Sequence, residues 1–376
     1  MWRLVAATIV LNLLASVTVL AQDAVELFYG YYDDNENLTV QTPSIHIWKD
    51  LGERATVNVK YTYETFNIDA PEGDGADVVT GATTVAGGQG GGFNEVRQEV
   101  AGGGTYRFDW ATVGVNYFYS TEEDYNSNAF SLALSRSFFQ DNFTVSALYA
   151  RSFDEVDNLN PNPGEEFPRD RDSDTITLSL TQVLTPDMWI GGGYSYSHLS
   201  GFLSNPTRKI RIEQNLGPII AAKIFDEVHP SVRDRNTLFV RMKRHFQTRT
   251  AADANLSYYF DNWGVNGYAT EFRVSHYLFD DLIVRPRYRF YSQRQADFFR
   301  PVVTEVSEFM TADDRLRDFN SHFLGVKFDF GLKRLDTRLR DWRFTLSYDH
   351  YFESNAGFSG KTLHANILQT SLRIPF

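Results

Sequence analysis

The chain has 376 residues, of which 42% are hydrophobic and 15% aromatic, and it contains no cysteine. This composition excludes a disordered chain, and a mean hydropathy of −0.35 excludes a bundle of transmembrane helices. Without cysteine there is no disulfide, thiolate metal site or covalent haem attachment. The formal net charge of −12 argues against nucleic acid as a partner, because binding phosphate requires an excess of basic residues.

The first residues have the parts of a secretory signal peptide. Arg3 precedes an apolar run over 4–14, and the small residues ending at Ala21 suit cleavage by a signal peptidase. We therefore interpret residues 1–21 as a cleaved signal peptide and residues 22–376 as a single mature domain. A membrane anchor is the alternative, but the run is shorter than the roughly 18 apolar residues that a spanning helix needs.

Most of the remaining sequence alternates between apolar and polar residues with a period of two. Ala55, Val57, Val59, Tyr61 and Tyr63, for example, are separated by polar side chains. Such alternation predicts strands with one apolar and one polar face. The runs are about 10 to 15 residues long, whereas strands of soluble domains are nearer 5 to 6. We therefore predict an all-β fold, a closed antiparallel transmembrane β-barrel.

Counting the alternating runs predicts about sixteen strands. They lie near 25–33, 38–48, 54–68, 96–108, 111–121, 127–138, 143–153, 173–184, 188–199, 236–247, 251–261, 267–279, 282–294, 319–331, 342–353 and 363–376. The longest connections in this scheme all fall at the same end of the barrel: 69–95, 154–172, 200–235 and 295–318. Outer-membrane barrels have long outer loops and short periplasmic turns, so we expect both termini on the periplasmic side.

One long loop contains an apolar segment with its own pattern. Pro218 suits the first position of a helix, and the apolar residues that follow it have helical spacing. We therefore predict a short helix over 218–228. It would either fold into the mouth of the barrel or pack on its rim.

The end of the chain indicates how the protein reaches its membrane. Phe376 is the terminal residue, and Leu372 and Ile374 share its face of the last expected strand. A terminal aromatic residue on an amphipathic strand resembles the signal that delivers outer-membrane proteins to the barrel insertion machinery. We therefore expect the protein in the outer membrane of a Gram-negative bacterium, with that machinery and outer-membrane lipid as partners.

Five short segments, spread over nearly all of the expected mature chain, carry a family resemblance. They are Asp77–Thr83, Leu180–Pro186, Gly201–Pro206, Tyr258–Gly264 and Arg289–Phe299. Together and in this order they resemble the bacterial family called domain of unknown function 3570, although serine is more usual in the family at Thr80 and Thr83. The resemblance implies an outer-membrane barrel with no established activity and assigns no catalytic residue. It also implies a setting near flavinylation and redox proteins of the envelope.

The polar faces of the second half of the chain are densely charged. The candidate pore-lining residues are Arg241, Lys243, His245, Asp253, Glu271, Arg273, Arg285, Arg287, Arg289, Asp329 and Asp349. A charge that faces lipid at the membrane midplane costs roughly 2–4 kcal/mol, so we expect the three alternating arginines to face the lumen. Because the set contains both signs, part of it is expected to form an internal salt-bridge network.

The first half of the chain has a different polar face, made mostly of small neutral residues. They are Ser131, Ser135, Ser137, Thr175, Thr177, Ser179, Gly191, Gly193, Ser195 and Ser197. A wall that is cationic on one side and neutral on the other predicts a transverse field that favours small polar or anionic solutes. A purely structural network in a plugged barrel is the alternative.

No arrangement of residues indicates an enzyme or a cofactor. Asp349 and His350 are adjacent on an expected strand and point to opposite faces, and the 8 histidines form no His-Glu-x-x-His or comparable ligand set. We therefore expect no catalysis, cofactor or metal; a membrane-embedded hydrolase is a weaker alternative. Two functions remain, a pore and a non-conducting structural or partner-binding barrel that serves an envelope redox or secretion assembly.

Overall fold

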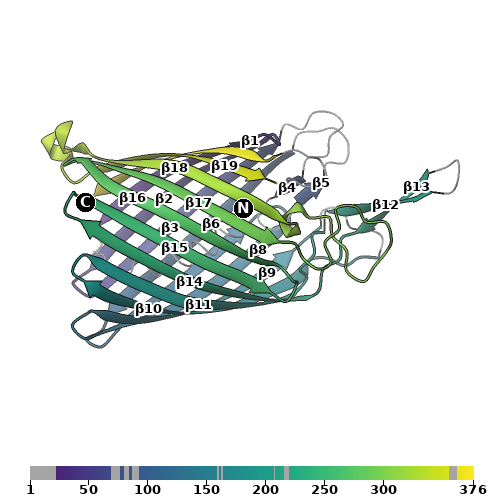
Figure 1. Cartoon of the computed structure of the whole chain (residues 1–376), viewed down its shortest axis with the longest axis horizontal. Coiled ribbons are helices and arrows are strands. Elements are labelled where there is room, and N and C mark those ends of the chain that lie inside the picture. Colours follow the sequence, from purple (N-terminus) through teal and green to yellow (C-terminus); the bar gives the residue numbers. More distant parts are fainter. Residues whose placement is uncertain are drawn as a thin grey trace.

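The computed structural model describes residues 23–68, 77–79, 84–86, 93–158, 161, 164–206, 208–215, 220–354 and 362–376. Their main element is a closed antiparallel barrel of sixteen strands, in which consecutive barrel strands pair and the first closes against the last (Figure 1). The prediction of fold class and strand number is confirmed. The predicted signal peptide over 1–21 lies outside the described residues.

The barrel strands follow the alternating runs of the sequence closely. They are β1 (Ala24–Asp34), β2 (Leu38–Leu51), β3 (Ala55–Ile68), β6 (Phe93–Arg107), β7 (Thr112–Thr121), β8 (Tyr125–Phe138), β9 (Phe143–Val156), β10 (Arg169–Thr185), β11 (Met188–Gly201), β14 (Val232–Phe246), β15 (Thr250–Asp261), β16 (Asn266–Phe279), β17 (Leu282–Arg294), β18 (Phe319–Gly331), β19 (Arg343–Ser354) and β20 (His364–Pro375). No helix in the described residues is long and apolar enough to cross a membrane.

The remaining elements lie in the connections. They are two small sheets, β4 (Asp77–Val79) with β5 (Thr84–Ala86) and β12 (Lys209–Asn215) with β13 (Ile220–Asp226), and three 3-10 turns, η2 (Asp314–Leu316), η3 (Leu332–Arg334) and η4 (Thr337–Leu339).

The β12–β13 hairpin corrects the predicted helix over 218–228. In the structure 220–226 is a strand that pairs with 209–215. Ile210 and Ile212 of β12 are buried against a second loop, and Phe225 of β13 packs on the same cluster. The pairing partner and the buried face supplied by another loop outweigh the local helical spacing, because tertiary packing commonly overrides propensity.

The two ends of the barrel differ in the length of their connections (Figure 1). The turn end carries the short connections and the C-terminus, where the backbone N–H of Phe376 donates to the carbonyl oxygen of Asp23 at 3.0 Å. The loop end carries the longest connections and both small sheets, although short connections over 35–37, 122–124 and 262–265 also lie there. The longest connections share one end of the barrel, as predicted. The 3-10 turns η3 and η4 lie in the longest connection of the turn end.

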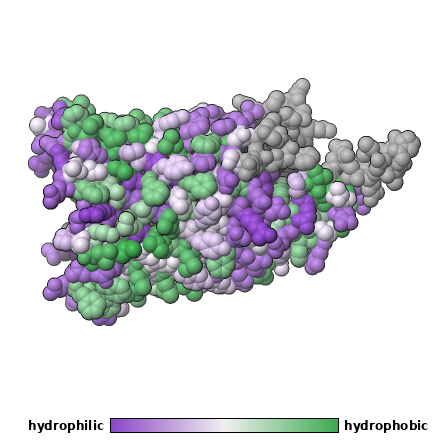
Figure 2. Space-filling model, in the orientation of Figure 1, coloured by the Kyte–Doolittle hydropathy of each residue, from purple (hydrophilic) through white to green (hydrophobic). Residues whose placement is uncertain are grey.

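The outer face of the wall is apolar. Outward side chains such as Leu132, Leu178 and Val240 are 46% to 54% exposed. Figure 2 shows hydrophobic surface spread along the wall and a hydrophilic patch toward the loop end. So much exposed apolar surface is costly in water and suits the lipid-facing band of a membrane barrel.

Tyrosines with tethered hydroxyl groups are spaced around this band. On seven of the described strands an outward tyrosine shares a hydroxyl hydrogen bond of 2.5–3.1 Å with a polar side chain on the next barrel strand, nearer the loop end. The pairs are Tyr29–Gln41, Tyr61–Gln98, Tyr117–Asn128, Tyr149–Asp174, Tyr194–Asn236, Tyr288–His322 and Tyr348–Asn366. We call them the tyrosine girdle, since an apolar ring with a polar tip suits the membrane–water interface.

The orientation of the barrel can be tested by labelling, because the chain contains no native cysteine. Val306, in a long loop, is 60% exposed, and Leu335, in the longest turn, is 78% exposed. We expect a membrane-impermeant maleimide to label Val306→Cys on intact cells, and Leu335→Cys only after the outer membrane is opened. Labelling of Leu335→Cys on intact cells would show the opposite orientation.

Candidate functional site

The predicted charged residues lie on the inner face of the barrel. All of them occupy the face of their strands opposite the exposed apolar side chains. Asp349, for example, is 0% exposed, whereas its neighbour Tyr348 is 47% exposed. We call this set, on β14 to β19, the charged wall. That its members line an open pore stays a prediction.

The carboxylates of the charged wall are all paired. Arg241 binds Asp253 at 2.9 Å, Arg273 binds Glu271 at 2.5 Å, Arg287 binds Asp349 at 2.6 Å, and Arg285 binds Asp329. The side chains of the four arginines are still 29% to 39% exposed, so solvent reaches the wall.

Two cations of the charged wall remain without a carboxylate. Lys243 and Arg289 have no ion pair or hydrogen bond from their side chains to any described residue. Arg289 lies opposite Glu271 in the strand register, but Glu271 binds Arg273 instead. The charged wall therefore carries more positive than negative charge.

One ion pair of the charged wall crosses over an intervening strand. Arg287 on β17 and Asp349 on β19 both align with Gly325 on β18, and the guanidinium donates to both carboxylate oxygens at 2.6 and 2.8 Å. A Cβ atom at position 325 would overlap the carboxylate of Asp349. Glycine is therefore required here for the side chains of two non-adjacent strands to meet.

A second set of charged groups closes the inner face near the loop end. These residues, which we call the loop-end belt, form four ion-paired groups: Arg97 with Glu64 and Glu122, Arg171 with Asp154, Arg233 with Asp261, and Arg317 with Glu353. No side chain among them is more than 10% exposed. The belt is therefore desolvated, whereas the arginines of the charged wall reach solvent.

The neutral part of the inner face is held by hydroxyl pairs across strands. Thr175 lies 2.8 Å from Ser197, and Thr177 lies 2.8 Å from Ser195, oxygen to oxygen. Ser197 aligns in turn with Arg235 of β14. The hydroxyl-lined wall and the charged side of the barrel thus meet between β11 and β14.

Three of the segments that carry the family resemblance converge beside the belt. Leu203, Trp263, Ala296 and Phe299 belong to one buried apolar cluster. The guanidinium of Arg233 lies over the ring of Trp263, 4.2 Å from its centre. These segments therefore fix the loops on the rim and also cover one arginine of the belt.

Two long loops are joined by a buried carboxylate. Asp313 binds Arg315 at 2.5 Å within its own loop and lies 3.6 Å from Arg208 of the loop that carries β12. Burial alone raises the pKa of Asp313, but Arg315 and Arg208 together lower it below its usual value. The carboxylate is therefore ionised at neutral pH and ties the loops together.

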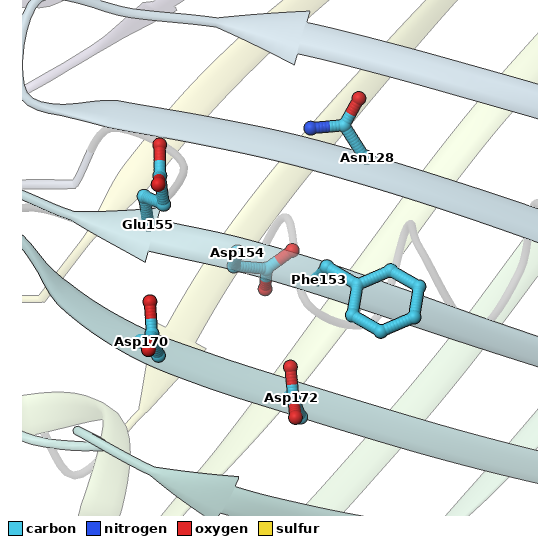
Figure 3. Close-up of a pocket in the computed structure, with 6 residues that line it drawn as sticks. All are labelled: Asn128, Phe153, Asp154, Glu155, Asp170 and Asp172. Carbon is cyan, nitrogen blue, oxygen red and sulfur yellow. The ribbon is translucent and has the colours of Figure 1, made fainter.

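A shallow hollow on the outer surface holds a second group of carboxylates. Figure 3 shows Glu155, Asp170 and Asp172 on the adjacent strands β9 and β10, beside Asn128 and Phe153. Glu155 and Asp170 are exposed. Water and salt screen such a cluster, so it carries no site by itself.

The part of the belt on β14 lay outside the predicted strand for an identifiable reason. β14 begins at Val232, whereas the predicted strand began at residue 236. Arg233 and Arg235 were therefore assigned to a loop, although they continue the period of two that contains Arg241. If the alternation of apolar and polar residues had been followed further toward the N-terminus, both arginines would have been placed on the inner face.

Comparisons with known proteins agree with this architecture. The family model described as "Protein of unknown function (DUF3570)" matches residues 3–368, which confirms the resemblance of the five segments. The fold is similar to that of a bacterial polysaccharide outer membrane secretin, with a TM-score of 0.52 and 8% identity over 95% of this chain and 99% of that chain. No curated protein matches the sequence.

Two porin structures are more distantly similar. A BenF-like porin from Pseudomonas fluorescens Pf-5 has a TM-score of 0.47 and 10% identity, and the outer membrane protein OpdK from Pseudomonas aeruginosa has 0.45 and 8%. Each alignment covers 94% of this chain and 98% of the other. The closed sixteen-strand sheet and the similarity to the secretin identify the fold as that of an outer-membrane β-barrel.

The Arg287–Asp349 ion pair, which passes over Gly325, predicts how a methyl group at position 325 affects stability. We expect Gly325→Ala to displace the carboxylate of Asp349 and to lower the free energy of unfolding by about 3 kcal/mol, because a buried charge loses its partner. Urea unfolding in detergent micelles, followed by tryptophan fluorescence, measures the change. Gly102→Ala is the control, since a Cβ there would lie 3.7 Å from its nearest neighbour, and equal midpoints for the two variants would contradict the prediction.

Proposed function

We propose that this chain, which belongs to that family of proteins of unknown function, is an outer-membrane pore for small polar or anionic solutes. The observation that carries the proposal is the charge balance of the charged wall. Its four carboxylates are each engaged by an arginine, while Lys243 and Arg289 have no carboxylate partner among the described residues.

The location of these cations supports an effect on passing solutes. The arginines of the wall are hydrated, and the opposite part of the inner face is neutral and hydroxyl-lined. A fixed positive potential inside a low-dielectric wall concentrates anions and lowers the barrier to their passage.

The net charge of −12 is the competing consideration, because a negative protein repels anions. Exposed carboxylates at the loop end, such as Glu155 and Asp170, contribute to it. Salt screens such groups over about 10 Å at 0.1 M, whereas partly buried charges are screened much less. We therefore expect the inner face to decide the selectivity.

The route to the membrane belongs to the same proposal. The apolar band and the tyrosine girdle suit a lipid bilayer, and the terminal Phe376 suits recognition by the barrel insertion machinery. Cleavage of residues 1–21 and residence in the outer membrane of a Gram-negative bacterium complete it. No catalytic step, cofactor or nucleic acid is part of this function.

A non-conducting barrel that serves an envelope redox or secretion assembly is the second candidate. The loop-end belt favours it, because Glu64, Arg97, Glu122 and Asp154 point inward and are nearly inaccessible to solvent. A lumen filled at this level by paired side chains would pass no steady current.

Conductance and ion selectivity separate the two candidates. For the wild type in planar bilayers across a salt gradient, we expect steady open steps and a reversal potential that shows anion preference. Lys243→Ser combined with Arg289→Ser removes the unpaired charges without exposing a partner carboxylate, so the reversal potential should move toward cation preference.

A charge-neutral variant provides the control. Arg287→Ser combined with Asp349→Ser removes one complete ion pair, so the charge balance and the selectivity should stay unchanged. Cation preference in the wild type, or an unshifted reversal potential in the first variant, would refute an anion-selective pore. Absence of any conductance would favour the non-conducting barrel.

A further inference from the structure

Arg235 on β14 is an inward-facing cation at the level of the loop-end belt. Its strand neighbours are Ser197 on β11 and Asp261 on β15. The side chain makes no ion pair with the described residues, and its Nε atom is buried without a hydrogen-bond partner. Burying this nitrogen without a partner is costly, because buried polar groups ordinarily form hydrogen bonds.

The nearest carboxylate is already saturated. Asp261 accepts two hydrogen bonds from Arg233, one from the hydroxyl of Tyr259 and two from the backbone N–H groups of Trp263 and Val265. These five donors use the lone pairs of both oxygens. Arg235, although directly opposite Asp261 in the register, is left without a bond to it.

The next carboxylate along the belt is also occupied. Asp154 accepts from Arg171 and from the hydroxyl of Ser127. Arg171 and Arg233 lie close enough to Arg235 to repel it electrostatically. Three arginines therefore share two carboxylates here, and the excess positive charge falls on Arg235.

Neutral donors surround the same position. Ser197 aligns with Arg235, and its hydroxyl forms a pair with that of Thr175, so one hydroxyl proton of the two stays available. Arg235 thus lies on the strand where the hydroxyl-lined wall meets the charged side of the barrel. A guanidinium with adjacent hydroxyl groups is well suited to hold an oxyanion through two parallel hydrogen bonds.

We propose that Arg235 is the centre of an oxyanion-binding site in the lumen, with Ser197 and Thr175 as auxiliary donors. Its ligand is a small solute that presents a carboxylate or a phosphate group. The biological role of the site rests on the proposed pore, in which it binds the permeating anion at the level of the belt. Binding itself requires no conduction, so the site can be tested separately.

The test is calorimetric titration of the mature protein in detergent micelles with inorganic phosphate and, in a second series, with acetate, at constant ionic strength. We expect saturable binding of at least one of the two anions. The anion that binds distinguishes a phosphate ligand from a carboxylate ligand. Arg235→Gln should weaken binding at least about tenfold, the loss expected for a charge-assisted hydrogen bond.

Two further variants make the result specific. Arg249→Gln removes an exposed arginine in the turn-end connection between β14 and β15 and should leave the affinity unchanged. Arg235→Lys keeps the charge but loses the two parallel donors, so it should bind more weakly than the wild type. It also serves if the glutamine variant fails to fold.

The outcomes that overturn the site are distinct from those that overturn the pore. No binding of either anion to the wild type, unchanged affinity in both Arg235 variants, or equal losses in the Arg249 and Arg235 variants would each refute the site. Binding without conductance would support the site and reject the pore. Conductance without binding would support the pore and reject the site.

Discussion

A closed sheet in a lipid bilayer has only one face on which charge can be kept. The outer face must be apolar, because a charge at the membrane midplane costs roughly 2–4 kcal/mol. Charged residues in the strand segments that cross the apolar band must therefore turn inward, where only other inward residues can neutralise them. Asp349 illustrates the constraint, since it is reached by Arg287 across a strand that has glycine at the crossing point. The rest of the inner architecture depends on this requirement for internal partners.

The barrel meets the requirement differently at its two ends. In the loop-end belt, ion pairs such as Arg97–Glu122 are removed from water, so each lost partner would leave a costly buried charge. In the charged wall, solvent reaches the arginines, and unpaired cations such as Lys243 cost little. Two charges about 4 Å apart interact by about 1 kcal/mol in water and about 4 kcal/mol at an effective dielectric constant of about 20. The belt therefore organises the barrel, whereas the wall leaves charge available to a solute.

The alternation of residues was sufficient to predict the strands, because a strand has only two faces and a one-residue error would place arginines in lipid. The same reasoning identified the charged side of the inner face. It did not identify the belt, whose partners lie far apart in the sequence: Arg317 and Glu353 are separated by 36 residues. The predicted strand also began at residue 236, whereas β14 begins at Val232, and so omitted Arg235. The β12–β13 hairpin escaped prediction because its buried face is supplied by another loop.

The tyrosine girdle also has a mechanical consequence. Each of its rings is tied by its hydroxyl to the neighbouring strand, as Tyr149 is tied to Asp174 and Tyr348 to Asn366. An untethered ring can tilt to follow a change in membrane thickness, but a tethered ring cannot do so without losing its hydrogen bond. The tyrosine girdle is therefore rigid. Where the hydrophobic thickness differs, the surrounding lipids must stretch or compress to match the barrel.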